Sequence, residues 1–169
     1  MNFDTAFKML VNKNEGGFQN DADDKGNWTG GQKGVGQLRG TKYGISAATY
    51  PGEDIAALTL DRAAALYERD FWGPAGCGDV PDALRFDLFD TAVHASPRKA
   101  IKLLQRALGE VEDGVFGTRT LLAVKSMQEA RLLCRFNGER LDELNNNPHL
   151  WALYGRGWAQ RIADNLKRA

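Results

Sequence analysis

The chain has 169 residues, of which 43% are hydrophobic and 26% charged, and its 22 basic side chains balance 22 acidic ones. This length and composition are typical of a soluble globular protein with one domain, or one main domain and a small appendage. The zero net charge gives no general attraction to nucleic acid, and no apolar run approaches the roughly 18 residues of a membrane helix. Cys77 and Cys134 do not form a CxxC pair, so we expect reduced thiols rather than a disulfide scaffold or zinc site.

The N-terminal residues 2–17 are predicted to form the first helix, because apolar side chains recur there at helical spacing. Asn2 or Asp4 is suited to cap its start, and two glycines at 16 and 17 are suited to stop it. Glu15 would then lie at the C-terminal end of the helix. The helix dipole disfavours a negative charge at that end, which argues against a capping role for Glu15.

A long polar segment, residues 19–41, follows this helix and contains glycines at 26, 30, 31, 34, 36 and 40. Its glycines match neither a P-loop nor a dinucleotide-binding fingerprint. Loops of this length in compact domains commonly carry function. We therefore predict an irregular or hairpin-like loop that lines the substrate site.

The remainder of the chain is predicted to be helical, and it shows no long alternating strand pattern. Ser96 and Pro97 have the residue types of an N-cap and a first helical position. The sequence thus predicts a mostly α fold with a small β hairpin or irregular loop in the N-terminal third. The expected helices run from Thr59 to Gly73, over 81–96, over 96–109, over 118–145 as one or two helices, and over 147–169.

Several motifs occur in an order that resembles one known family. They are "EGGF", "TKYGIS", "ALYERDFW", "LRFDLFDTAVHASPRKAIKLLQRALG" and "DGVFGTRT". Over about residues 3–165 the chain resembles the N-acetylmuramidases of glycoside hydrolase family 108 with their C-terminal peptidoglycan-binding-3 region, which are phage-type endolysins and secretion-associated murein hydrolases. The resemblance implies a lysozyme-like helical fold, a catalytic region over 1–95 and a packed helical peptidoglycan-binding region over 96–169.

The resemblance also implies a reaction, the hydrolysis of the β-1,4 bond between N-acetylmuramic acid and N-acetylglucosamine, as in a lysozyme. The family's catalytic glutamate maps onto Glu15. Such a reaction needs an acid that protonates the leaving oxygen and usually a second group opposite it. Gly16 and Gly17 leave room for a sugar, and Phe18 is placed to shield the carboxyl from water. A lytic transglycosylase and a catalytically silent murein-binding or phage structural module are the alternatives.

The second catalytic group is expected in the acidic loop. Asp24 and Thr29 follow Glu15 at a spacing similar to the Glu, Asp and Thr of phage lysozymes. The stretch 27–40 resembles an insertion relative to the family, so it leaves Asp21 and Asp23 open as alternatives to Asp24. Thr41 competes with Thr29 for the same reason. The stereochemical outcome, inverting or retaining, is left open as well.

Three further residues are candidates for substrate binding. Trp28 and Tyr43 carry aromatic faces of the kind that pack on a pyranose, although Tyr43 is equally suited to core packing. Asp90 lies within an apolar helix, where a carboxylate must be either paired or functional. We favour the interpretation that Asp90 makes a structural hydrogen bond, and a place in the substrate cleft is the alternative.

In the "DGVFGT" motif, Asp113 and Thr118 either contact the glycan or shape a turn between helices.

No metal or other cofactor is expected. The chain has two histidines and no HExxH motif, and the acids of residues 20–27 lack the spacing and the bidentate glutamate of an EF-hand. The N-terminus does not resemble a Sec signal peptide. We therefore expect a monomer made in the bacterial cytoplasm that reaches the periplasm or cell wall through a holin or a secretion system, binding peptidoglycan rather than nucleic acid or membrane.

Overall fold

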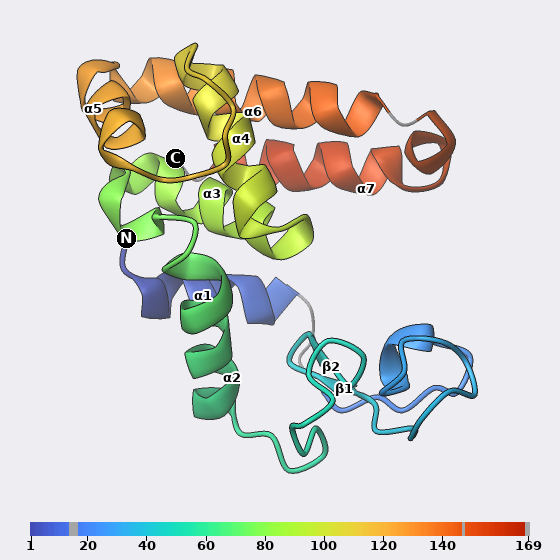
Figure 1. Cartoon of the computed structure of the whole chain (residues 1–169). Helices are drawn as coiled ribbons and strands as arrows, with labels where there is room; N and C mark the ends of the chain where they lie inside the picture. The colour runs from blue at the N-terminus through green and yellow to red at the C-terminus, as the bar shows by residue number, and fades with distance from the viewer. Residues whose placement is uncertain (14–16, 147, 168–169) are drawn as a thin grey trace. The chain divides into compact units, whose positions relative to one another are not determined.

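The computed structural model describes residues 1–13, 17–146 and 148–167. In these residues the chain forms seven α-helices and one two-stranded antiparallel sheet (Figure 1). This confirms the expected mostly α, lysozyme-like fold with a small hairpin in the N-terminal third. The helices are α1 (Phe3–Lys13), α2 (Leu60–Tyr67), α3 (Asp82–His94), α4 (Pro97–Leu108), α5 (Thr118–Ser126), α6 (Glu129–Asn145) and α7 (Pro148–Leu166).

The first helix, α1, is described from Phe3 to Lys13. It begins as expected, because the Asn2 side-chain oxygen accepts a hydrogen bond from the Thr5 amide at 3.0 Å. Its predicted end at Gly16 and Gly17 falls on residues 14–16, which lie outside the described residues, and stays a prediction. The predicted catalytic Glu15 and its neighbour Gly16 lie outside the described residues.

The signals that predict the start of α4 are confirmed. The Ser96 hydroxyl accepts from the Lys99 amide at 3.2 Å, and Pro97 is the first helical residue. Gly109 ends the helix in the left-handed conformation, at φ 77°, which glycine adopts without steric cost. The start could be predicted from the sequence because it depends on a few neighbouring residues.

Short turns and strands complete the structure. Three turns of helix, η1 (Lys25–Asn27), η2 (Glu68–Trp72) and η3 (Cys77–Asp79), join the longer elements. The strands are β1 (Thr41–Lys42) and β2 (Ile45–Ser46), with Thr41 opposite Ser46 and Lys42 opposite Ile45. The segment predicted as a helix from Thr59 to Gly73 is α2 followed directly by η2, a π-helical turn.

The chain divides into two compact units. The loop unit is Phe7–Tyr67, and its core includes Leu10, Ile45, Ile55 and Leu66. The helical unit comprises Met1–Ala6 together with Glu68–Ala169. These units are defined by compactness, whereas the boundary predicted at residue 96 separates a catalytic region from a binding region. That functional boundary stays a prediction.

The helical unit is organised around α3, which packs against α4, α6 and α7. Helices α6 and α7 run side by side (Figure 1). The fully buried side chains include Leu88, Phe89, Leu104 and Phe136. Among the residues that the structure describes, no helix is both long enough and apolar enough to cross a membrane.

Both cysteines are free thiols, as the sequence predicts. Cys77 is buried and Cys134 is exposed. Burial raises the pKa of the Cys77 thiol, so this side chain stays protonated and packs as a small apolar group.

Candidate active site

The segment that follows residue 16 is fixed to the hairpin by backbone pairing. Gln19 and Thr41 exchange two backbone hydrogen bonds, of 2.9 and 2.8 Å, in an antiparallel bridge. Successive side chains of an extended segment point to opposite faces, so Phe18 and Asn20 share one face and Gln19 lies on the other. Gly17, one of the predicted sugar-contacting residues, is exposed at the start of this segment.

The three aspartates of the acidic loop have different partners. Asp24 caps η1, since its Oδ1 accepts from the Gly26 amide at 2.8 Å, and its Oδ2 accepts from the Gln19 side-chain amide at 3.4 Å. Asp21 accepts from the Asp23 amide at 2.9 Å. Asp23 forms an ion pair with Lys33. All three carboxylates are exposed. Of the three, Asp24 accepts the hydrogen bond from the Gln19 side chain, and the backbone of Gln19 is in turn bonded to that of Thr41.

The two candidate threonines lie in different environments. The Thr29 hydroxyl accepts from the Gln37 amide at 2.9 Å, and the Thr29 amide donates to the Gln37 carbonyl at 3.0 Å. These bonds close the hairpin-like loop predicted for this region. The Thr41 hydroxyl lies in β1, on the element that pairs with the Gln19 segment, and donates to the Asn27 side-chain oxygen at 2.7 Å.

Asn27, which the sequence analysis did not single out, is the internal anchor of the loop. It is fully buried, and its side-chain nitrogen donates to the Asp21 carbonyl at 2.9 Å. Its backbone carbonyl accepts from the amides of Arg39 and Gly40 at 2.9 and 3.1 Å. An asparagine in a glycine-rich stretch is usually an exposed turn residue, so the sequence carried no signal of this role.

The two aromatic candidates are both half-buried. The Trp28 indole nitrogen donates to the Ala22 carbonyl at 2.9 Å, which ties its ring to the acidic loop. Tyr43 adopts φ 52° in the turn between β1 and β2, a conformation rare for a bulky residue. The turn is held by Tyr67, whose hydroxyl donates to the Tyr43 carbonyl at 3.1 Å. Backbone strain of this kind persists where the surroundings enforce it, commonly at functional sites.

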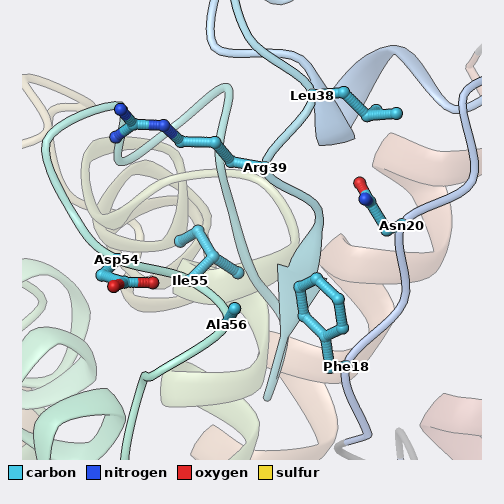
Figure 2. Close-up of a pocket in the computed structure, with 7 residues that line it drawn as sticks. All are labelled: Phe18, Asn20, Leu38, Arg39, Asp54, Ile55 and Ala56. Atoms are coloured by element: carbon cyan, nitrogen blue, oxygen red, sulfur yellow. The ribbon is translucent and has the colours of Figure 1, made fainter.

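A cavity of about 440 Å³ opens within the loop unit beside the Gln19 segment. Figure 2 shows its lining side chains, with the charged groups of Arg39 and Asp54 on one side of the view and Phe18 and Asn20 on the other. The remaining lining residues are Leu38, Ile55 and Ala56. Of these seven residues, Phe18 alone is among the substrate-binding residues predicted from the sequence.

Comparison with known proteins assigns the chain to a family. The model of the family described as glycosyl hydrolase 108 matches residues 8–95, just over half of the chain. The chain belongs to glycosyl hydrolase family 108. A solved structure of SagA from Brucella abortus is similar, with a TM-score of 0.79 and 28% sequence identity over 98% of this chain and 92% of that chain. A comparison with curated proteins finds no match.

Membership of family 108 makes the chain a glycoside hydrolase and supports peptidoglycan as its substrate. The matched residues lie within the region predicted to be catalytic, and they include Glu15 and the acidic loop. The expected peptidoglycan-binding-3 region, 96–169, lies beyond the match and stays a prediction.

In this family-108 chain, Asp90 is part of a buried charge network of the helical unit. The carboxylate is 0% exposed and accepts from Arg140 at 2.8 Å, from the Arg161 Nε at 2.8 and 2.9 Å, and from Asn165 at 3.2 Å. Arg140 also donates to Asp87 at 2.8 Å. These contacts favour the structural reading of Asp90, and its alternative role in substrate binding is an untested prediction.

The pKa values of the two buried carboxyls shift in opposite directions. Burial alone would raise the pKa of Asp90, but the hydrogen bonds and charges of Arg161 and Arg140 outweigh it and hold the pKa below its ordinary value. Burial dominates at Asp87 and raises its pKa despite the nearby Arg140 charge. The arginines therefore stabilise the charged form of Asp90 more strongly than that of Asp87.

The "DGVFGT" motif forms a turn whose polar groups are bound internally. The buried Gln105 side chain donates to Asp113 at 2.7 Å and to the Thr120 hydroxyl at 3.1 Å, and it accepts from the Gly114 amide at 2.9 Å. Thr118 begins α5, as predicted. These contacts account for Asp113 as a residue that shapes the turn.

The described part of the chain contains no group of three or more His, Cys, Asp or Glu side chains arranged to hold a metal ion. Its buried side-chain nitrogen and oxygen atoms all have hydrogen-bond partners.

Proposed function

We propose that this glycoside hydrolase is an N-acetylmuramidase of the lysozyme type. It cleaves the β-1,4 bond between N-acetylmuramic acid and N-acetylglucosamine in bacterial peptidoglycan, with Glu15 as the general acid. The observation that carries the proposal is the family match over residues 8–95, which includes the Glu15-Gly16-Gly17-Phe18 motif. In this mechanism Glu15 protonates the leaving oxygen as an oxocarbenium-like transition state forms.

Asp24 is proposed as the second carboxylate. An inverting glycosidase holds a water between its acid and a second carboxylate, whereas a retaining one uses the second carboxylate as nucleophile. Asp24 is exposed and oriented by the Gly26 amide and the Gln19 side chain. Asp23 already pairs with Lys33, which makes it the weaker candidate.

A threonine hydroxyl is proposed to orient the attacking water beside Asp24. Thr29 follows Asp24 at the lysozyme-like spacing, but its contacts with Gln37 close the loop. Thr41 lies in β1, whose backbone pairs with Gln19, the residue that also holds Asp24. We therefore favour Thr41 over Thr29 for this role.

Other parts of the chain complete the proposal. Residues 96–169 are proposed to bind peptidoglycan beside a catalytic region of residues 1–95. Trp28 and Tyr43 are proposed to contact sugar, since each presents a half-buried aromatic ring in the loop unit. A monomer made in the cytoplasm and released by a holin or a secretion system fits an enzyme that acts on the cell wall.

The decisive experiment is mass spectrometry of the soluble products released from purified peptidoglycan by wild type and Glu15→Gln. Reducing muropeptides that end in N-acetylmuramic acid, lost in Glu15→Gln and retained in the exposed control Glu68→Gln, are the expected result. Anhydro products would instead identify a lytic transglycosylase. The absence of products from wild type would identify a murein-binding module and contradict the proposal.

Matched pairs of variants separate the second-group candidates. Asp24→Asn is expected to lower kcat by a factor of about 10²–10⁴, the range for general acid–base groups, while Asp23→Asn retains most activity. Thr41→Val and Thr29→Val form the second pair, and the larger loss is expected for Thr41→Val. A larger loss in Asp23→Asn or Thr29→Val would reassign the corresponding role.

A further inference from the structure

The cavity of the loop unit is built by three separate segments of the chain. Phe18, the last residue of the proposed catalytic motif, and Asn20 form the first segment, residues 38–39 lie at the end of the glycine-rich loop, and residues 54–56 precede α2. Its volume of about 440 Å³ is within the ~300–1,000 Å³ of small-molecule sites. All three segments lie in one compact unit and within the residues matched by the family model.

Phe18 presents a ring that lies against Gly40 and stays partly exposed. A Cβ added to Gly40 would lie 2.7 Å from the Phe18 ring and closer still to the Gln19 carbonyl oxygen, so the ring rests directly against this glycine. Gly40 itself has φ 81°, a backbone conformation that favours glycine. Phe18 nevertheless remains 46% exposed. A partly exposed aromatic ring that lies against the backbone in this way is suited to pack on the apolar face of a sugar ring.

Arg39 is held in place by neutral groups. Its Nε donates to the Gln37 side-chain oxygen at 2.8 Å, and its Nη1 donates to the Pro51 carbonyl at 3.3 Å. Within the described residues, no ion pair involves Arg39 and no hydrogen bond involves its Nη2. The guanidinium is thus oriented without being neutralised, a state suited to binding a carboxylate through charge-assisted hydrogen bonds.

The cavity also offers neutral and acidic partners for sugar hydroxyl and amide groups. Asp54 accepts from the Ala57 amide at 3.2 Å through Oδ1, and its exposed carboxylate can also accept from a hydroxyl. Asn20 carries a side-chain amide with both donor and acceptor groups. The lining therefore combines one aromatic face, one cation and two hydrogen-bonding groups, which is more than a neutral sugar requires.

We propose that this cavity is a subsite for a muramyl unit, in which Phe18 packs on the sugar and Arg39 binds a carboxylate carried by its lactyl substituent. The proposal rests on the proposed function and names the part of the substrate that this cavity selects. N-acetylmuramic acid differs from N-acetylglucosamine by a 3-O-lactyl group, so a carboxylate on that substituent is what a cation can use to tell the two sugars apart. The carboxylate belongs to the lactyl group itself in peptide-free glycan, or to the stem peptide when one is attached.

Binding of three matched ligands to the Glu15→Gln protein tests the proposal. They are diacetylchitobiose, which has no carboxylate, the N-acetylglucosaminyl-N-acetylmuramic acid disaccharide, which has a lactyl carboxylate, and the same disaccharide with an L-alanyl-D-glutamyl stem. Titrations followed by amide NMR shifts give affinities and locate binding at residues 18–20, 38–39 and 54–56. We expect at least one of the two ligands with a carboxylate to bind about tenfold more tightly than diacetylchitobiose. The ligand that binds more tightly shows whether Arg39 binds the lactyl carboxylate or that of the stem peptide.

Two variants of the same loop identify the responsible cation. Arg39→Gln is expected to remove the preference for the carboxylate ligand while leaving diacetylchitobiose affinity within about twofold, and Arg39→Lys to retain part of it. Lys33→Gln removes an equal charge from the loop, at a residue that pairs with Asp23, and is expected to retain the full preference. Amide spectra of each variant verify that the loop unit remains folded.

Three results would overturn the inference. They are equal affinity for the charged and neutral ligands, a preference that survives Arg39→Gln, and binding without shifts at the residues that line the cavity. Each leaves the proposed function standing if Glu15→Gln still abolishes release of reducing muropeptides. Conversely, loss of the proposed function would appear in the products of wild type and would not depend on Arg39.

Discussion

The two units of the molecule are stabilised in different ways. In the helical unit, Glu68–Ala169 with Met1–Ala6, charged groups are buried and matched to one another, as at Asp87, Asp90 and Arg140. In the loop unit, Phe7–Tyr67, the ion pairs with described partners lie at or near the surface, and backbone turns define the shape.

This difference shows where each unit is vulnerable. A buried charge that loses its partner is strongly destabilising, so the helical unit depends on particular side chains. A turn that requires positive φ excludes most side chains, so the loop unit depends on glycines such as Gly40. The proposed catalytic and sugar-binding groups lie mainly in the loop unit, where backbone geometry places them and leaves their side chains available to substrate.

The largest effect on stability is expected from Arg140→Met. The substitution keeps much of the apolar stem but leaves Asp87 without its arginine and removes one of the two arginines of Asp90. Breaking a buried pair by removing one partner costs about 3–5 kcal/mol of unfolding free energy. Urea unfolding followed by circular dichroism measures the loss.

A double variant separates the penalty of an unpaired carboxylate from the loss of packing. If Arg140→Met is destabilising because of buried charge, replacing Asp87 with Leu in the same chain restores part of the stability. Equal stability of Arg140→Met and wild type would show that the buried charge network does not contribute to the unfolding free energy. The helical unit would then not depend on paired charges, contrary to the comparison of the two units.

The next largest effect is expected from Gly40→Ala in the loop unit. An alanine there adopts φ 81° and meets both the Gln19 carbonyl and the Phe18 ring. Strain and overpacking together are expected to destabilise this unit by about 2–4 kcal/mol. Hydrogen exchange of the amides from 18 to 41 measures this local effect, and peptidoglycan hydrolysis falls with it.

Gly34→Ala is the matched control, because Gly34 has φ 78° but an added Cβ there would meet no heavy atom within 4 Å. Only the backbone strain applies, and it costs roughly 1 kcal/mol. Equal effects of the two substitutions would show that contact with Phe18 and Gln19 does not define the loop.

Acid pH is expected to weaken the helical unit through Asp90. The folded-state pKa of Asp90 is below its unfolded value of about 3.8, so its stabilising contribution is complete above pH 3.8 and is lost as the pH falls below it. Asp87 opposes this change, because its pKa is raised and its burial penalty disappears on protonation. Asp90→Asn should therefore reduce the drop in urea midpoint between pH 5 and pH 3, whereas Asp61→Asn at an exposed site should not. An unchanged drop in Asp90→Asn would contradict this sign.

Local sequence signals predicted much of this fold. The cap of Ser96, the first helical residue Pro97 and the start of α5 at Thr118 each depend on neighbouring residues, and all are confirmed. The partners of Asp90 could not be predicted, because Arg140 and Arg161 lie 50 and 71 residues away in sequence. The apolar periodicity of a helix indicates that a carboxylate is buried, but it does not identify the cation that pairs with it.

The candidate site was predicted less completely than the fold. Its motif at Glu15, Asp24 and Phe18 is local and readable, whereas the roles of Asn27 and Arg39 depend on how the glycine-rich loop returns to the Gln19 segment. The spacing of Asp24 and Thr29 suggested a pair, which stays a prediction, and the structure places the alternative hydroxyl of Thr41 on β1. Sequence separation is a poor guide to distance where a loop closes on itself.

The smallest effect is expected at the exposed pair of Asp23 and Lys33. Both side chains are mostly exposed, at 78% and 64%, so water and salt screen their attraction. Lys33→Gln should change the unfolding free energy by less than about 1 kcal/mol, and the change should shrink further at high ionic strength. Urea midpoints at low and high salt measure it. A loss comparable to that of Arg140→Met would mean that the loop unit also depends on paired charge, and the contrast between the two units would then rest on their turns alone.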